Sequence, residues 1–391
     1  MNPPPELDHS RQLFTPAFVA LLAVQFACGL SLSVFFLLPK ILVSRLHAGP
    51  FEVGLVSGSF GLAAVAVIPL VAWRIDHVRR LPMVRAATVI LIVTSLGFLL
   101  VQRAGILAVA LRGMQGVAWA LVYCAGSALV SEMAPRERLA QTIGVWGSAN
   151  LVTSAIAPAF AEPLIDLLGP PAAYLMAAIA AAVGLGFTRR IQETRRGTSG
   201  LHVRGIVAVL RRPSTMRMLL VLVIAGIAYG AMFTFHQPMA LQLGITSVRG
   251  FFIWYTLGAL GVRIGLGGMI DRVGPLRMSI AALLGYTIVV VGMRNLDAGT
   301  LSLYGGLFGI AHGVFFPAHM ALIVSTANPT ERGRILTFAN GGFIAGTSAV
   351  LPLGLVAEKI GYSGVYTAAG LATLIAVGIL IRWPPGAVRT S

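Results

Sequence analysis

A small set of polar and ionisable side chains interrupts the long apolar stretches of this chain, and these residues are the best equipped for chemistry. They are Gln25, Arg112, Gln115, Glu162, Arg263, His312 and His319. Ionisable groups inside a membrane are costly and usually have a function. A guanidinium offers a fixed positive charge to an anion, and a carboxyl or imidazole group can exchange protons. The set therefore predicts substrate contact and proton movement.

Arg112 and Glu162 are the best candidates for tying substrate to proton movement. Arg112 lies about five residues, or ~7.5 Å, into its apolar stretch, and its alternative role is an arginine that snorkels to the interface. Glu162 is the carboxylate that we place within an apolar stretch. Its alternative role is a passive, ionised group at the wet outer mouth.

The remaining candidates also carry two interpretations each. Arg263 could bind a substrate carboxylate through two parallel hydrogen bonds or pair with a neighbouring helix. His312 and His319 are seven residues apart and share a helix face. They could relay protons, contact substrate, or pack as hydrogen-bonded histidines. Gln25 could bind substrate or a neighbouring helix.

Composition indicates the elements that must position these residues. Apolar residues make up 57% of the 391-residue chain and charged residues 11%, and the mean hydropathy is +0.86; soluble domains carry about 25% charged residues. A span needs roughly 20 apolar residues, and twelve such stretches are present. Backbone groups cannot face lipid unpaired, so these stretches must be helices. The expected fold is an all-α membrane protein with 12 transmembrane helices.

An internal repeat divides these helices into two sets of six. Asp76 pairs with Asp271 at an offset of 195 residues, and Gly116 pairs with Gly309 at an offset of 193 residues. Two tandem membrane halves are typical of transporters with pseudo-symmetric bundles. We expect an N-terminal bundle at residues 1–188, a basic linker at 189–217, and a C-terminal bundle at 218–391.

The net charge of +16 is explained by membrane topology rather than by nucleic-acid binding. If the N-terminus is inside, 21 of the 29 Lys and Arg residues fall in cytoplasmic segments. The six assigned to outside segments are Lys40, Arg45, Arg103, Arg249, Arg294 and Lys359. This bias predicts that both termini are cytoplasmic and that the basic segments contact anionic lipids of the inner leaflet.

Charged residues at the inner helix ends recur in both halves and predict a cytoplasmic gate. The first set is Asp76, Arg80, Glu132 and Arg138, and the second is Asp271, Arg272, Glu331, Arg332 and Arg334. Carboxylates at these places can accept hydrogen bonds from helix N-termini and guanidinium groups. The pairs would form when the halves close on the inside and break when they part. The alternative is static anchoring of short loops.

Signatures of enzymes are missing from the sequence. No nucleophile elbow, metalloprotease motif or phosphate-binding loop is present. The two cysteines, Cys28 and Cys124, suggest neither a metal site nor a disulfide framework. We therefore expect no enzymatic activity and no bound cofactor, and any pumping must use an ion gradient, with H⁺ as the expected ion.

Local motifs resemble those of the major facilitator superfamily. The family's Gly-x-x-x-Asp-Arg-x-Gly loop is matched by Gly267, Asp271, Arg272 and Gly274, and only partly by the first copy around Asp76. The fourth helix resembles Arg-x-x-Gln-Gly-x-x-x-Ala, and the loop after it resembles the acidic–Pro–Glu–Arg pattern; these matches are Arg112, Gln115, Gly116, Ala120, Glu132, Pro135, Glu137 and Arg138. The stretch from Ala157 resembles the antiporter pattern Gly-Pro-x-x-Gly-Gly, but Glu162 replaces a glycine.

This resemblance implies a secondary transporter that works by alternating access, closest in pattern to bacterial drug/proton antiporters. The expected function is proton-coupled efflux of a small organic molecule by a monomer in the inner membrane. One alternative is a symporter or facilitator of organic anions, favoured by Arg112 and Arg263. A second alternative is a transport-dead sensor or lipid-handling protein on the same fold.

Overall fold

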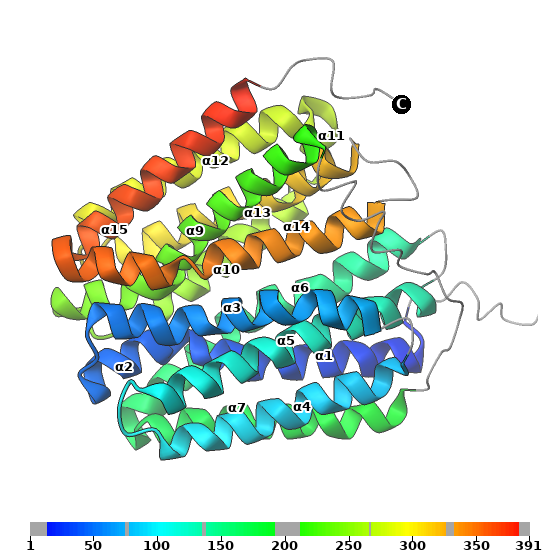
Figure 1. Ribbon diagram of the computed structural model, residues 1–391, viewed down its shortest axis with the longest axis horizontal. Helices are drawn as coiled ribbons and strands as arrows, with labels where there is room; N and C mark the ends of the chain where they lie inside the picture. Colours follow the sequence, from blue (N-terminus) through cyan, green and yellow to red (C-terminus); the bar gives the residue numbers. More distant parts are fainter. Residues whose placement is uncertain are drawn as a thin grey trace, which may run out of the picture.

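The computed structural model describes residues 14–74, 78–134, 138–191, 212–265, 267–325 and 332–382, and the regular elements in these ranges are helices (Figure 1). The first group is α1 (Pro16–Val34), η2 (Phe35–Leu37), α2 (Leu38–Leu46), α3 (Pro50–Arg74), α4 (Arg80–Gly97), η3 (Phe98–Leu100), α5 (Ile106–Met133), α6 (Leu139–Leu168), α7 (Pro170–Phe187) and η5 (Thr188–Arg190). The second is α9 (Pro213–Gln242), α10 (Arg249–Gly265), α11 (Gly267–Val273), α12 (Pro275–Gly292), η6 (Met293–Asn295), α13 (Leu301–Ser325), α14 (Arg332–Thr347) and α15 (Val350–Ile381).

The same packing occurs in both groups of helices. In the first group, α5 packs against α3 and α4, and α1 packs against α6 and α7. In the second group, α13 packs against α10 and α12, and α9 packs against α14 and α15. The two groups lie one above the other in Figure 1. The helical membrane fold expected from the repeat is therefore confirmed, whereas the linker at 189–217 lies mostly outside the described residues.

Glycines at equivalent places of the repeat allow the closest helix contacts. A Cβ atom on Gly116 of α5 would lie 2.0 Å from the carbonyl oxygen of Phe60, and one on Gly309 of α13 would lie 2.0 Å from that of Tyr255. No side chain fits at either position, so α3 meets α5, and α10 meets α13, through their backbones. Small residues serve this purpose at helix contacts in membranes.

Ten described helical segments are long and apolar enough to span a membrane. The last of them, Phe338–Ile381, runs for 44 residues and holds two spans, because α15 bends where Gly361 adopts φ +75°. Helix α10 has only 17 residues before the chain reaches Leu266, outside the described residues, and resumes as α11. When the last segment is counted as two spans, and α10 together with α11 as one more, the structure accounts for all twelve predicted spans.

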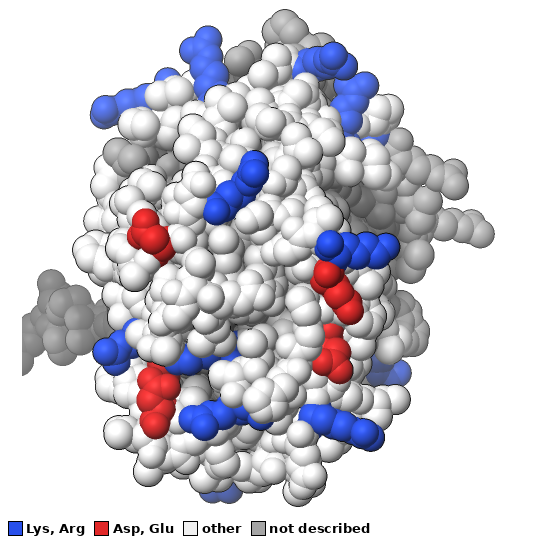
Figure 2. All heavy atoms as spheres, turned by 90° about the vertical axis from the view of Figure 1, so that its left-hand side faces the viewer, with Lys and Arg blue, Asp and Glu red and all other residues white. Residues whose placement is uncertain are grey.

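The helix array has two ends, which we call the terminus side and the latch side. The terminus side carries the beginnings of α1 and α9 and the end of α15, which lie toward the right and the top of Figure 1. The latch side carries α2 and the connection between α9 and α10. Figure 2 shows the latch side, where acidic and basic side chains are interspersed.

Candidate functional site

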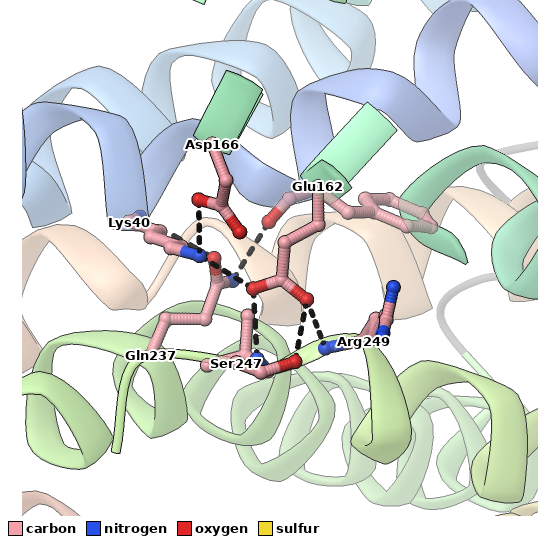
Figure 3. A network of polar contacts seen from close by, with 8 residues as sticks. Lys40, Glu162, Asp166, Gln237, Ser247 and Arg249 are labelled. Atoms are coloured by element: carbon pink, nitrogen blue, oxygen red, sulfur yellow. Dashed lines mark hydrogen bonds and ion pairs between the residues drawn. The ribbon is translucent and has the colours of Figure 1, made fainter. Parts of the chain in front are cut away.

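Glu162 of α6 occupies the point where the two groups of helices meet on the latch side. It is only 1% exposed. One oxygen, Oε1, accepts hydrogen bonds from Lys40 Nζ at 2.6 Å and from the backbone N–H of Val248 at 2.8 Å. The other, Oε2, accepts from the Ser247 hydroxyl at 3.1 Å and from the N–H of Arg249 at 2.8 Å (Figure 3). The carboxylate of one group is thus bound by the backbone of the other.

The backbone donors belong to the beginning of α10, which starts at Arg249. The first N–H groups of a helix have no partner within the helix, and their dipoles favour a negative charge there. Glu162 therefore caps a helix of the opposite half. This capping requires that α6 and α10 stay together, so it holds the latch side closed.

Lys40 supplies the opposite charge. Helix α2 begins after the short η2 turn, and this places Lys40 inside the bundle with 5% exposure. Its ammonium group contacts Glu162 at 2.6 Å and the more exposed Asp166 at 3.5 Å. Sequence analysis assigned Lys40 to an outside segment and did not identify it as a site residue. Its only sequence signal is a lysine directly following an apolar run.

Gln237 of α9 makes a second connection between the two halves. Its Nε2 group donates to the carbonyl oxygens of Phe36 at 2.7 Å and Phe233 at 3.0 Å, and its Oε1 accepts from the N–H of Lys40 at 3.3 Å. We call Lys40, Glu162, Gln237, Ser247 and the N–H groups of residues 248 and 249 the latch.

Further contacts between the halves lie on the latch side or near the middle of the helices. Ser154 of α6 and Thr256 of α10 share a hydrogen bond of 3.2 Å. The ring of Phe36 lies 5.3 Å from that of Phe233. A Cβ atom on Gly54 of α3 would lie 2.4 Å from the carbonyl oxygen of Val350. These close approaches join the halves at further points besides the latch.

The same helices have free space around them nearer the terminus side. Added Cβ atoms on Gly144 and Gly147 of α6, or on Gly261 and Gly265 of α10, would meet nothing within 4 Å. These four glycines are exposed, whereas Ser154 and Thr256 are buried where α6 meets α10. The contacts that join the two halves through α6 and α10 therefore lie on the latch side and near the middle of these helices.

Arg112 and Gln115 lie together inside the first half. Arg112 is 8% exposed, donates to Gln115 Oε1 at 2.7 Å, and lies over the rings of Phe60 at 4.6 Å and Phe35 at 5.8 Å. No carboxylate contacts it among the described residues. Arg112 is therefore buried against aromatic faces, which attract cations, and does not snorkel. Gln25 on α1 is also buried, at 4% exposure.

Arg263 and His312 belong to an aromatic region of the second half. Arg263 is half-buried and lines a cavity of about 140 Å³ with Gly313 and Pro317. His312 hydrogen-bonds to Tyr286, and its ring lies 5.1 Å from that of Tyr229. This arrangement combines one cation with several aromatic rings.

His319 lies apart from His312 in its contacts. Its Nε2 lies 3.1 Å from the carbonyl oxygen of Met218 on α9, and its ring stacks on Phe315 at 5.2 Å. His312 instead contacts α12 through Tyr286. The shared helix face predicted from their spacing therefore does not give a shared partner.

The predicted gate is described only in part. Arg80 and Glu132 form an ion pair that joins α4 to α5. Asp76 and Glu331 lie outside the described residues, as do the side chains of three others, Asp271, Arg332 and Arg334. Arg138 and Arg272 are exposed at helix ends. The described part pairs Glu132 with Arg80 within one half.

Two equivalent groups of helices, most of them long and apolar enough to span a membrane, form the architecture of a multi-pass membrane protein. The sequence profile of the Major Facilitator Superfamily matches residues 19–294 and 252–390, and the chain belongs to this superfamily. This confirms the resemblance stated from the motifs.

Individual relatives show the breadth of this superfamily. The chain is 28% identical to the 3-(3-hydroxy-phenyl)propionate transporter of Escherichia coli K12, over 41% of this chain and 39% of that protein. It is 25% identical to the multidrug resistance protein MdtG of Citrobacter koseri, over 54% and 55%. The nucleoside transporter NupG has the same fold, with a TM-score of 0.71, 14% identity, and coverage of 94% of this chain and 100% of that one. The chain therefore spans about half or less of the length of the two curated relatives.

Proposed function

We propose that the protein exports a small, mostly apolar organic solute in exchange for protons, by alternating access between its two halves. The observation that carries this proposal is the latch. Its central group is a buried carboxyl group, which can gain and lose a proton, placed where it joins the halves. Relatives that transport small molecules, including a multidrug resistance protein, support it.

The chemistry of the carboxyl group links proton binding to conformation. An ionised carboxylate accepts from all four donors, whereas a protonated one carries its own hydrogen and loses both charge and acceptor capacity. Uptake of a proton by Glu162 therefore opens the latch, and loss of the proton closes it. For transport to be coupled to protons, the proton that binds Glu162 must be released toward the space between the halves. It must not return to the solution that supplied it. In this proposal Arg112 supplies a fixed positive charge for the interaction with the substrate.

Transport in proteoliposomes tests this function. The purified protein is reconstituted and offered a panel of small apolar compounds with and without a pH gradient. We expect at least one compound to move against its concentration gradient only when the pH gradient is present. Equal transport in both conditions for every compound that moves would contradict proton coupling.

The membrane orientation follows from the positive charge of the predicted inner segments. We propose that the terminus side faces the cytoplasm, with both termini and residues 189–217, and that the latch side faces outward in a bacterial inner membrane. On a background lacking Cys28 and Cys124, we expect Thr246→Cys, at an exposed position on the latch side, to react with an impermeant maleimide from outside intact cells. Ser199→Cys should react only after the cells are opened, and the reverse pattern would reject this orientation.

A second candidate function is transport of organic anions, and the position of Arg263 favours it. Arg263 lines a cavity together with Val262, Gly313 and Pro317, where its guanidinium could bind a carboxylate. We expect Arg263→Gln to lower the apparent affinity for aromatic carboxylates at least tenfold and to leave the export of uncharged compounds intact. The conservative Arg263→Lys is the matched control, because it keeps the charge and loses the planar fork. If Arg263→Gln leaves anion transport unchanged, this second candidate function is rejected and proton-coupled efflux is the one that remains.

A further inference from the structure

An apolar groove of about 590 Å³ runs along the outside of the first half between α1 and α7. On α1 it reaches from Val19 to Leu30, and on α7 from Met176 to Phe187. Its lining is apolar throughout. The hollow exists because residues such as Ala23 and Ala180 have small side chains, and larger residues form its margins.

The length of the groove matches one leaflet of a membrane. Val19 and Leu30 are eleven residues apart, which corresponds to ~16 Å along a helix. The hydrocarbon core of a bilayer is about 30 Å thick, so one leaflet is about 15 Å. The groove begins where α1 starts and α7 ends, at the terminus side. It therefore extends from that membrane surface to the middle of the bilayer.

Basic residues mark the surface end of the groove. Arg189 and Arg190 follow α7 in the η5 turn, and both are exposed. The guanidinium of Arg190 lies 5.7 Å from the ring of Phe187, which lines the groove. Arg85 of α4 holds this turn in place by donating to the Thr188 hydroxyl at 3.3 Å. Two positive charges are thus fixed next to the entrance.

We propose that this groove is a binding site for an anionic phospholipid of the leaflet on the terminus side. One acyl chain fills the hollow between α1 and α7, and the phosphate is bound by Arg189 and Arg190. A protein segment fits less well, because its backbone N–H and C=O groups would find no partner on an apolar lining. An acyl chain has no such groups, and the two arginines match a negative headgroup.

Native mass spectrometry after extraction from vesicles of equal phosphatidylglycerol and phosphatidylcholine tests this site. We expect the wild-type protein to retain phosphatidylglycerol preferentially. The double variant Arg189→Gln/Arg190→Gln should lose about thirty-fold of that preference, from ~1 kcal/mol for each basic residue near the surface. The matched control is Arg277→Gln/Arg382→Gln, which removes two exposed arginines from the second half and should keep the preference.

Variants that fill the groove distinguish lipid binding at this site from general electrostatic attraction to the membrane surface. Ala180→Phe, or the milder Ala23→Leu, should reduce the retained phosphatidylglycerol although both arginines remain. The melting temperature of each variant verifies its fold, and Ala23→Leu decides the outcome if Ala180→Phe does not fold. Unchanged retention in the folded groove variants would overturn the proposal. So would a lipid-free dimer of the wild-type chain that Ala23→Leu disrupts, because a second copy would then occupy this groove.

Discussion

Glu162→Gln is expected to abolish accumulation driven by a pH gradient while leaving substrate exchange intact. Glutamine keeps the shape of the side chain but cannot take up a proton, and exchange requires no net proton movement. Its amide nitrogen also replaces one acceptor by a donor, at a place where Lys40, Ser247 and two backbone N–H groups already donate. The closed latch should therefore be weakened as well.

Paired assays in proteoliposomes measure the two activities separately. One assay follows accumulation of a transported compound under an imposed pH gradient, and the other follows exchange of labelled for unlabelled compound at equal pH. Glu52→Gln is the matched control, because Glu52 is exposed and caps α3 of its own half through the N–H of Gly49 at 2.9 Å. Normal gradient-driven accumulation in Glu162→Gln would remove Glu162 from the coupling mechanism and favour His312, His319 or Arg263.

Lys40→Met is expected to destabilise the protein by about 3–5 kcal/mol, because removing one partner of a buried ion pair leaves the other charge uncompensated. Glu162→Gln should be destabilising for the same reason. The double variant removes both charges, so its loss should be smaller than the sum of the two single losses by ~1–3 kcal/mol. The free energy of unfolding in detergent, measured by denaturant titration of all four proteins, gives this difference.

Asp166→Asn provides the control for this cycle. The side chain of Asp166 is 58% exposed and lies 3.5 Å from Lys40, and exposed ion pairs contribute only about 0–1 kcal/mol. Its substitution should therefore change the stability little. If the losses for Lys40→Met and Glu162→Gln are simply additive, the two residues are not coupled and the latch does not depend on their pairing.

Much of the fold could be predicted because hydrophobic length and the repeat are local properties of the sequence. The glycine pair Gly116 and Gly309 was visible as a repeat and proves to be a pair of equivalent backbone contacts. The break near Gly361 was also visible, because Glu358 and Lys359 interrupt the apolar residues just before it, and Lys359 was assigned to an outside segment. Two of the twelve apolar stretches predicted as spans, at residues 335–356 and 365–381, lie on either side of this bend.

The latch could not be predicted in the same way. Glu162 stood out as a carboxylate in an apolar stretch, but its partners come from other parts of the chain. Lys40 is 122 residues away, and the residues at 247–249 are 85 to 87 away. Two of these partners are backbone N–H groups, which no residue type reveals. Only the packing of α6 against α10 identifies Glu162 as part of a connection between the halves.

Some contacts of the latch are made by main-chain groups and others by side chains, and this difference determines which positions can vary during evolution. On the side of α10, two of the three donors are main-chain N–H groups, which every amino acid except proline possesses. The exposed Arg249 can therefore diverge freely, and Val248 is restricted only because its side chain is fully buried in the hydrophobic core. On the side of α6 the carboxylate itself is needed. Mutational drift can thus change the α10 side of this contact without disrupting it, while the selective constraint falls on Glu162 and on Lys40, its buried charged partner.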